Sequence, residues 1–324
     1  MSAVTVVGAG VIGLSTGIRL AENGHSVSTV TVDEPTATSS MAATGMVGLA
    51  FAQPMDRVPG WERATVAEMD TIRSTGGAAG VRIERCLLGS RSSDARPPGI
   101  DGWPGYRSAG PDELPAGFPY GFWLDMTVVD MSRYLPYLAD RYRAAGGAIE
   151  IGRVESLDDL TGDVVVNCAG IGARALTDDD TLTGRWGMHT VVANPGIDYC
   201  FMEGPPGQAE WVAWMPHGDK ILIGGIIDDD ADHPTPDIAT GTRLHTAAGH
   251  VEPRLADAAV LGHTSGIRPA RPAVRVEEES RPSGPRLIHN YGHGGLGVTL
   301  SWGCADDVVR LLADGTGDRR SGLR

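Results

Sequence analysis

Three glycines near the start of the chain, Gly8, Gly10 and Gly13, have the spacing G-x-G-x-x-G, and Asp33 follows about 20 residues later. This pattern is typical of a turn that binds a dinucleotide. The first glycine permits a tight turn, the second admits a pyrophosphate, and the third lets a helix pack against a strand. An acidic residue at this distance is suited to accept a hydrogen bond from a ribose hydroxyl. The pattern indicates a nucleotide cofactor but does not separate FAD from NAD.

A second glycine-rich stretch, "NYGHGGLGVTLSWGCADD", runs from Asn290 to Asp307 and becomes apolar and helix-like in its second half. A turn with so few side chains lets backbone N–H groups face something large that is anionic or electron-rich. The stretch therefore indicates a second binding turn, far from the first in the sequence.

The elements that must position these turns can be traced in the sequence. Val4–Val7 and Val27–Val32 are β-branched runs on either side of an apolar helical pattern that stops at Asn23-Gly24, as in a strand–helix–strand unit. Val164–Val166 predicts another buried strand, which ends in a turn of small residues. We expect these strands to form one parallel sheet.

The remaining chain is less regular. Residues 130–144 predict a helix with Leu135, Leu138 and Tyr142 on one face, and residues 186–227 alternate as in an antiparallel sheet. Residues 51–127 are rich in proline and glycine, and we expect short strands and long loops there.

Composition excludes several classes of protein. The chain has 324 residues, enough for two domains, and its formal net charge of −14 argues against nucleic acid as a partner. The four cysteines lack CxxC spacing and the histidines lack metal-ligand spacing, so we expect no metal site. The apolar runs are too short for a membrane span and the start does not resemble a signal peptide, so we expect a cytoplasmic protein.

Six segments in order resemble the D-amino-acid oxidase family: "VVGAGVIGLS", "YLPYLADRYRAAGGAIEIGRVESL", "VVVNCAGIGARAL", "ILIGGI", "GIRPARPAVRVE" and "IHNYGHGGLGVTLSWGCA". They cover almost the full length. The resemblance implies an α/β fold with an FAD-binding Rossmann-like domain, built on a parallel sheet, and a mainly antiparallel β-sheet substrate domain. We expect residues 1–50, 128–184 and 260–324 in the former and 51–127 and 185–259 in the latter.

The resemblance implies that FAD is the cofactor, bound noncovalently, with the turn "HNYGHGG" of residues 289–295 against the flavin ring. The positions that match the family's FAD contacts lie in five stretches of the chain. They are Gly8, Ala9, Gly10, Val11, Ile12, Gly13, Asp33, Ser39, Ser40, Ala43, Val154, Cys168, Ala169, Gly170, Gly294, Gly297, Val298 and Thr299. Cys168 and Cys304 are also typical of small buried apolar residues, without any role in chemistry.

The resemblance places Arg268 and Gly295 at the catalytic centre. Family members pass a hydride from the substrate Cα to the flavin, and Arg268 occupies the position of the arginine that binds the substrate carboxylate. A guanidinium can make two parallel hydrogen bonds to a carboxylate, which suits this role. We expect Arg271 and Arg275 to serve the structure.

The expected substrate pocket differs from that of the family. Ala209 and Ala213 stand where tyrosines are usual, with Trp211 and Trp214 beside them, and Trp186 and Met188 replace an arginine and a glutamine. The segment around Val47 differs as well. Trp211, Ala213, Trp214, Met188 and Val47 are therefore candidate pocket residues. The two tryptophans either contact an unusual substrate or fill the space that the tyrosines leave.

Three functions remain open from the sequence. The first is an FAD-dependent oxidase of the D-amino-acid type, which acts on a small amino-acid-like substrate with oxygen as the electron acceptor. A homodimer is compatible with this function. The second is a specialised biosynthetic flavoenzyme acting on an unusual amino acid or a secondary amine. The third is a flavin-binding protein without catalysis, against which Arg268 argues because an inactive site needs no carboxylate ligand.

Overall fold

The computed structural model describes residues 1–204, 209–229 and 234–318, which form two compact units. Unit 1 comprises Met1–Val81, Met131–Gly184 and Arg268–Arg324, and unit 2 comprises Arg82–Asp130 and Arg185–Ile267. These bounds differ from the expected domains in three places, because residues 51–81 belong to unit 1, whereas residues 128–130 and 260–267 belong to unit 2.

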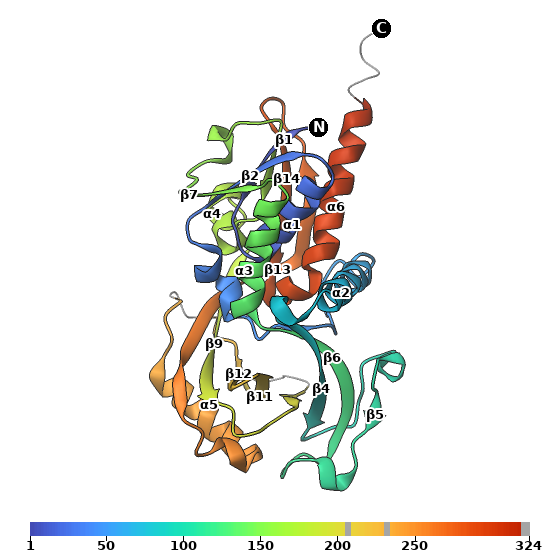
Figure 1. Ribbon diagram of the computed structural model, residues 1–324, viewed down its shortest axis with the longest axis vertical. Coiled ribbons are helices and arrows are strands. Elements are labelled where there is room, and N and C mark those ends of the chain that lie inside the picture. Colours follow the sequence, from blue (N-terminus) through green and yellow to red (C-terminus); the bar gives the residue numbers. More distant parts are fainter. Residues whose placement is uncertain (205–208, 230–233, 319–324) are drawn as a thin grey trace. The chain divides into compact units, whose positions relative to one another are not determined.

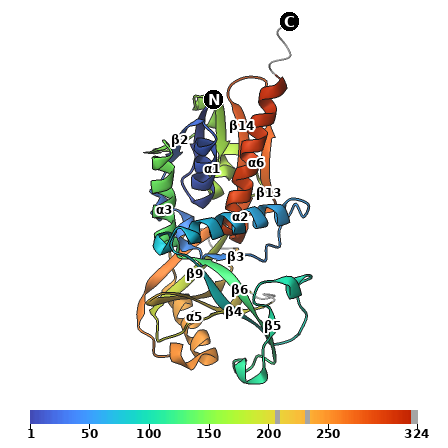
Figure 2. The ribbon, with the colours of Figure 1, turned by 45° about the vertical axis from the view of Figure 1, so that its right-hand side comes forward.

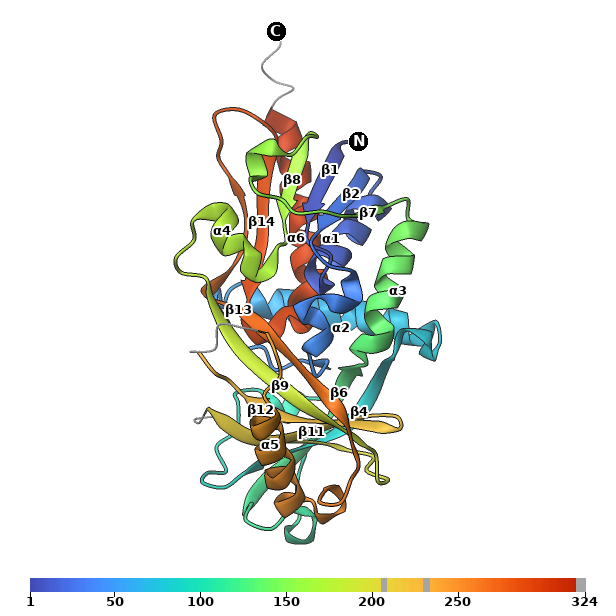
Figure 3. The same cartoon turned by 90° about the vertical axis from the view of Figure 1, so that its left-hand side faces the viewer.

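The sheet of unit 1 is mostly parallel (Figure 3). β1 (Ala3–Val7) lies between β2 (Ser26–Thr31) and β8 (Val164–Asn167), and β7 (Ala148–Ile151) pairs with β2. On the other side, β14 (Arg286–His293) runs parallel to β8, and β13 (Val260–Glu279) runs antiparallel to β14. The strands predicted at Val4–Val7, Val27–Val32 and Val164–Val166 are confirmed within one or two residues.

Three helices of unit 1 lie side by side, with α1 (Val11–Glu22) between α3 (Met131–Ala144) and α6 (Gly297–Asp318) (Figure 1). The predicted helix at 130–144 is confirmed, and its buried side chains include Leu135, Leu138 and Tyr142. Asn23 caps α1 and Gly24 adopts a positive φ of 83°, so the predicted stop is also confirmed.

The expectation of short strands and long loops over residues 51–127 is wrong for its first part. α2 (Val58–Ser74) is a helix of 17 residues that packs on α6 (Figure 2). Its apolar face buries Trp61, and the two helices approach so closely that a Cβ added at Gly303 would lie 2.2 Å from the Cα of Trp61. Packing against α6 therefore outweighs the weak local helix signal of this segment.

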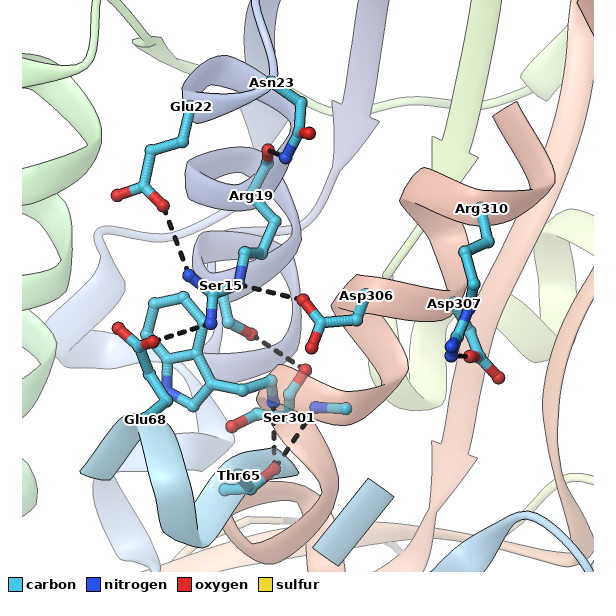
Figure 4. Close-up of polar contacts among 12 residues, drawn as sticks. Ser15, Arg19, Glu22, Asn23, Thr65, Glu68, Ser301, Asp306, Asp307 and Arg310 are labelled. Atoms are coloured by element: carbon cyan, nitrogen blue, oxygen red, sulfur yellow. Dashed lines mark hydrogen bonds and ion pairs between the residues drawn. The ribbon is translucent and has the colours of Figure 1, made fainter. Parts of the chain in front are cut away.

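A polar network joins the four helices, and Figure 4 shows the part of it that lies between α1, α2 and α6. The carboxylate of Glu68 in α2 accepts hydrogen bonds from Arg19 of α1 and from Arg141 of α3, each at 2.6 Å. Both guanidinium groups lie over the ring of Trp302 in α6, at 4.6 and 4.9 Å from its centroid. Arg19 also pairs with Asp306 of α6 at 2.9 Å.

Unit 2 is built on a mainly antiparallel sheet in the strand order β6-β4-β10-β11-β12-β9. Its strands are β4 (Val81–Ser90), β6 (Tyr120–Val129), β9 (Thr183–Ala193), β10 (Cys200–Glu203), β11 (Glu210–His217) and β12 (Lys220–Ile226), with the short β5 (Arg107–Ser108) beside β6. The pairing of β4 with β10 is parallel.

A helix that the sequence analysis did not predict, α5 (Ile238–Val251), packs on β11 and β12 of unit 2. Asp237 caps its first turn through the N–H groups of Ala239 and Thr240. Among the described residues, no helix combines the length and the apolar character that crossing a membrane requires.

Candidate active site

The turn between β1 and α1 requires glycine at two positions for reasons internal to the chain. Gly8 has a φ of 100°, and a Cβ there would lie 2.6 Å from the carbonyl oxygen of Cys168. A Cβ at Gly13 would lie 1.8 Å from the carbonyl oxygen of Gly8. The helix therefore begins directly against the strand end, as the G-x-G-x-x-G spacing predicts.

The N-terminus of α1 lies against Ser40, and a Cβ added at Gly10 would lie 2.9 Å from the Ser40 hydroxyl oxygen. Gly10 has no side chain to cap the helix, and the hydroxyl of Ser40 accepts a hydrogen bond from the Val11 N–H at 3.0 Å. Ser39 is exposed, Ser40 is half-buried, and both belong to the short 3-10 helix Ser39–Ala42, which Ala43 follows. Backbone N–H groups and hydroxyls at a helix N-terminus suit a pyrophosphate.

The other predicted cofactor positions of the first half of the chain follow the carboxyl ends of parallel strands. Asp33 is exposed after β2, Val154 follows β7, and Cys168 to Gly170 follow β8. Val154 and Ala169 pack against the same buried apolar cluster. Since parallel strands end at one edge of a sheet, the structure brings these residues to the edge that carries Gly8 to Gly13.

The surroundings of Cys168 agree with the interpretation of this residue as a small buried apolar one. Its side chain is buried, its sulfur lies 3.9 Å from the hydroxyl of Thr16, and burial raises the pKa of the thiol to about 12. The thiol of Cys304 is also buried, and burial raises its pKa. Neither sulfur is a nucleophile at neutral pH, because neither forms a thiolate there.

The second glycine turn meets the first. Gly294 has a φ of 56° in the 3-10 helix Gly294–Leu296 after β14, and α6 begins at Gly297. A Cβ at Gly297 would have Val11 and Ile12 as its nearest neighbours, at 3.8 and 3.9 Å. The protein itself leaves room for a side chain at Gly297, so the bare backbone there fits the close approach of a flat ring.

The residues after Gly297 offer only their backbone to a ligand. Val298 is buried, and the hydroxyl of Thr299 is engaged with the segment that contains β3 (Met46–Val47). This hydroxyl donates to the Met46 carbonyl and accepts from the Gly48 N–H, each at 3.4 Å. The N–H groups at the start of α6, with the positive end of its dipole, are suited to an electron-rich ring edge.

Arg268 lies beside the second turn. A Cβ added at Gly295 would lie 3.5 Å from Cδ and 3.7 Å from Nε of Arg268. Burial lowers the pKa of Arg268, although a guanidinium stays charged in proteins. A half-buried guanidinium next to an open glycine suits a carboxylate, which matches its planar fork. Gly295 and Arg268 thus come together as predicted.

The surroundings of His293 do not suit a general base. Its side chain is 4% exposed, burial lowers its pKa to about 3, and its Nε2 has no hydrogen-bond partner among the residues that the structure describes. The imidazole is therefore neutral at physiological pH and weakly basic.

The predicted pocket residues of unit 2 divide into two groups. Trp214 and Met188 belong to the main apolar core of unit 2, where Trp214 stacks on Phe201 at 4.5 Å and donates to the Tyr199 carbonyl at 3.1 Å. Their burial favours the space-filling interpretation over contact with a substrate. Val47 of unit 1 is likewise 1% exposed.

Ala213 and Trp211 are not part of that core. Ala213 pairs with Gly224 of β12, and a Cβ at Gly225 would lie 2.5 Å from the indole nitrogen of Trp211. Their contact with a substrate stays a prediction. The sequence analysis gave no role to His189, which pairs with Gly224 and whose ring would lie 2.3 Å from a Cβ there. A glycine inside a strand is the signal that indicates such a close ring.

Sequence reasoning also missed Asp179, which binds Arg271 at 2.9 Å and Tyr291 at 2.9 Å. The predicted structural role of Arg271 and Arg275 agrees with their contacts, since Arg275 donates to the Tyr291 hydroxyl at 2.7 Å.

Comparisons with known proteins identify the family of this chain. A model of the FAD dependent oxidoreductase family matches residues 3–311. A D-amino-acid oxidase of Streptomyces coelicolor is 38% identical over 317 residues, which cover 96% of both chains. A D-amino-acid oxidase of Rubrobacter xylanophilus is 38% identical over 310 residues, which cover 94% of both chains.

The fold also matches a solved structure, the glycine oxidase of Geobacillus kaustophilus, with a TM-score of 0.80 at 19% identity over 97% of this chain and 95% of that chain. The family match spans both glycine turns and the arginine between them in sequence. The chain is therefore a member of the FAD dependent oxidoreductase family, an oxidoreductase that uses FAD.

Proposed function

We propose that this protein is an FAD-dependent oxidase of the D-amino-acid oxidase type. It removes a hydride and a proton from an amino acid to give an imino acid, which hydrolyses to a 2-oxo acid and ammonia. Oxygen takes up the two electrons and two protons and leaves as hydrogen peroxide. The similarity to two D-amino-acid oxidases at 38% identity over nearly the whole chain supports this reaction class.

The observation that carries the substrate class is Arg268 beside Gly295. When bound, FAD supplies the two-electron acceptor. The guanidinium of Arg268 binds the substrate carboxylate through two hydrogen bonds and so fixes the direction of the Cα–H bond. Orientation of this kind can contribute about 7–11 kcal/mol to the lowering of a barrier.

No basic side chain is assigned to the Cα hydrogen. The neutral imidazole of His293 and the protonated thiol of Cys168 are both unsuited to proton abstraction at neutral pH. A substrate whose amine is already neutral can release hydride without a protein base, so the chain's contribution is to bind and orient.

A second candidate is a specialised amine oxidase that acts on an unusual amino acid or a secondary amine. The absence of tyrosine at positions 209 and 213 favours it, because alanine at both positions removes two hydroxyls that relatives use near the substrate. The two candidates share the flavin and the arginine and differ only in the substrate.

Anaerobic bleaching of the flavin tests these alternatives. Common D-amino acids that bleach the yellow protein support the first candidate, and bleaching by secondary amines or unusual amino acids alone supports the second. If the protein is yellow but no amine bleaches it, the result supports a flavin-binding protein without catalysis. Peroxide release in air checks oxygen as the acceptor.

The role of Arg268 is tested by Arg268→Ala, with Arg153→Ala at an exposed arginine of unit 1 as the control. We expect Arg268→Ala to raise KM by roughly a hundredfold or more while FAD affinity is retained, because bidentate charge-assisted pairs are strong. Unchanged KM in Arg268→Ala would refute the proposed carboxylate contact.

A further inference from the structure

Arg268 lies on a strand whose pairing is interrupted close by. β13 and β14 pair regularly from Arg275 onward, and Ala270 pairs with His293, but between these points four residues, 271–274, stand opposite one residue, Gly292. A bulge of this size leaves the strand position to be set by side-chain contacts rather than by regular pairing.

One carboxylate holds both sides of the interruption. Oδ2 of Asp179 accepts from Nε of Arg271 on β13 at 2.9 Å and from the hydroxyl of Tyr291 on β14 at 2.9 Å. Oδ1 accepts from the N–H and the hydroxyl of Thr181 at 3.0 and 2.5 Å. The Asp179 side chain is only 8% exposed. Its two oxygens therefore join the strands to each other and to one loop.

The neighbours of Asp179 are themselves fixed. Arg271 donates through Nη1 to the Ala273 carbonyl at 2.9 Å, inside the bulge. Gly292 has a φ of 84°, and a Cβ there would lie 2.9 Å from Cβ of Arg271. Glycine at position 292 therefore gives the Arg271 side chain room to pass over the backbone of β14. The Tyr291 hydroxyl also accepts from Arg275 at 2.7 Å. The network is thus closed around a buried carboxylate.

Its location connects it to the site. Arg271 is three residues from Arg268 on β13, and Tyr291 is four residues from Gly295 on the chain that leaves β14. These are the two segments whose separation sets the distance between the guanidinium and the second glycine turn.

We propose that Asp179 is a positioning residue for substrate binding, which holds Arg271 and Tyr291 together and so fixes Arg268 against Gly295. The inference rests on the proposed function, in which Arg268 binds the substrate carboxylate. Thr181, Arg271 and Tyr291 keep the carboxylate ionised, since their hydrogen bonds outweigh the effect of burial and hold the pKa of Asp179 well below its usual value.

The test compares Asp179→Asn with Asp180→Asn, a change at the next residue, whose side chain is 96% exposed. The probe is benzoate, a carboxylate without an amine or a Cα hydrogen, and its binding is followed in the flavin absorption of the holoenzyme. We expect Asp179→Asn to weaken benzoate and raise KM by about tenfold, with kcat and FAD affinity changed less than about threefold. Asp180→Asn is expected to match the wild type.

A merely structural role predicts a different result. In that case Asp179→Asn lowers Tm and FAD affinity without a selective loss of benzoate, and the proposal is overturned. If Asp179→Asn does not fold, Tyr291→Phe removes one of the same hydrogen bonds. We expect Tyr291→Phe to weaken benzoate binding as well. Unchanged benzoate affinity in Tyr291→Phe overturns the proposal.

A double-mutant cycle with Arg268→Lys separates the proposal from the proposed function. If Asp179 acts through Arg268, the loss caused by Asp179→Asn shrinks when position 268 is already lysine, and full additivity contradicts the proposal. If no amino acid bleaches the flavin of the wild-type protein, the result counts against the proposed function. If the wild type is bleached normally but Asp179→Asn binds benzoate as tightly as the wild type and has the same KM, the result counts against the positioning role alone.

Discussion

At the scale of single residues, the glycines of this protein fall into two classes that the sequence alone does not distinguish. Gly8 and Gly13 are required by the chain itself, since a Cβ at either would overlap backbone atoms. Gly297 is not, because its φ is that of an ordinary helix and its nearest neighbours lie 3.8 Å or more from a Cβ. We propose that glycine at position 297 serves the close approach of the cofactor rather than the fold.

Gly297→Ala is therefore predicted to separate folding from cofactor binding. Without FAD, its free energy of unfolding should be unchanged or higher by up to about 1 kcal/mol, as expected for alanine in a helix. FAD affinity should fall about tenfold or more, or ~1.4 kcal/mol. Urea unfolding of the apoprotein and quenching of FAD fluorescence measure the two quantities. Gly13→Ala, by contrast, should destabilise the apoprotein by about 1–3 kcal/mol.

His293 gives the stability a pH dependence whose sign follows from its low pKa. The unfolded chain binds a proton at this residue below about pH 6.5, whereas the folded state does so only near its pKa of about 3. The stabilising contribution is present above pH 6.5 and is lost as the pH falls toward 3, at up to about 1.4 kcal/mol per pH unit. Urea unfolding between pH 7 and 5 should show a smaller slope in His293→Gln, and an identical slope would argue against a neutral buried imidazole.

At the scale of elements, the sequence predicted those segments whose local signals agree with their packing. The strand–turn–helix at the start of the chain and α3 carry such signals. α2 does not, because Pro59 and Gly60 open it and a run of glycines and alanines follows it. Its buried residues Trp61, Thr65, Met69 and Ile72 nevertheless have helical spacing. The contact with Gly303 that makes α2 part of unit 1 joins residues far apart in the sequence, which no local pattern reveals.

Glu68 of α2 links three helices, because its carboxylate pairs with Arg19 of α1 and Arg141 of α3 beside Trp302 of α6. Burial alone would raise the pKa of Glu68, but hydrogen bonds from Arg141 and Arg19 hold this pKa below its usual value. Glu68→Gln is predicted to destabilise the protein by about 1–3 kcal/mol, because two partly buried guanidinium groups lose their shared carboxylate. Urea unfolding measures this change. Glu155→Gln, at an exposed carboxylate of unit 1, should have an effect below about 0.5 kcal/mol.

At the scale of the whole molecule, the family resemblance identified the cofactor because its motifs are local, whereas the support of the site is not. Asp179 carries no local motif that marks it in the sequence, yet it is bound to two strands that come much later in the chain. The pocket positions show the same limit, since Trp214 and Met188 alternate with their neighbours along strands and only the fold decides which face is core.

The two glycine turns are adjacent in unit 1 although they lie at opposite ends of the chain, so parts of FAD should protect them separately. ADP carries the pyrophosphate and ribose that suit Gly8 to Gly13 and Asp33, and riboflavin carries the ring that suits Gly294 to Gly297. We predict that ADP slows amide exchange mainly in residues 8–13, riboflavin mainly in residues 294–299, and FAD in both. FAD at 100 times its Kd should also add about 2.7 kcal/mol to the free energy of unfolding. Protection of residues 294–299 by ADP alone would mean that the second turn does not face the flavin ring, and the placement of Arg268 beside the reacting carbon would lose its support.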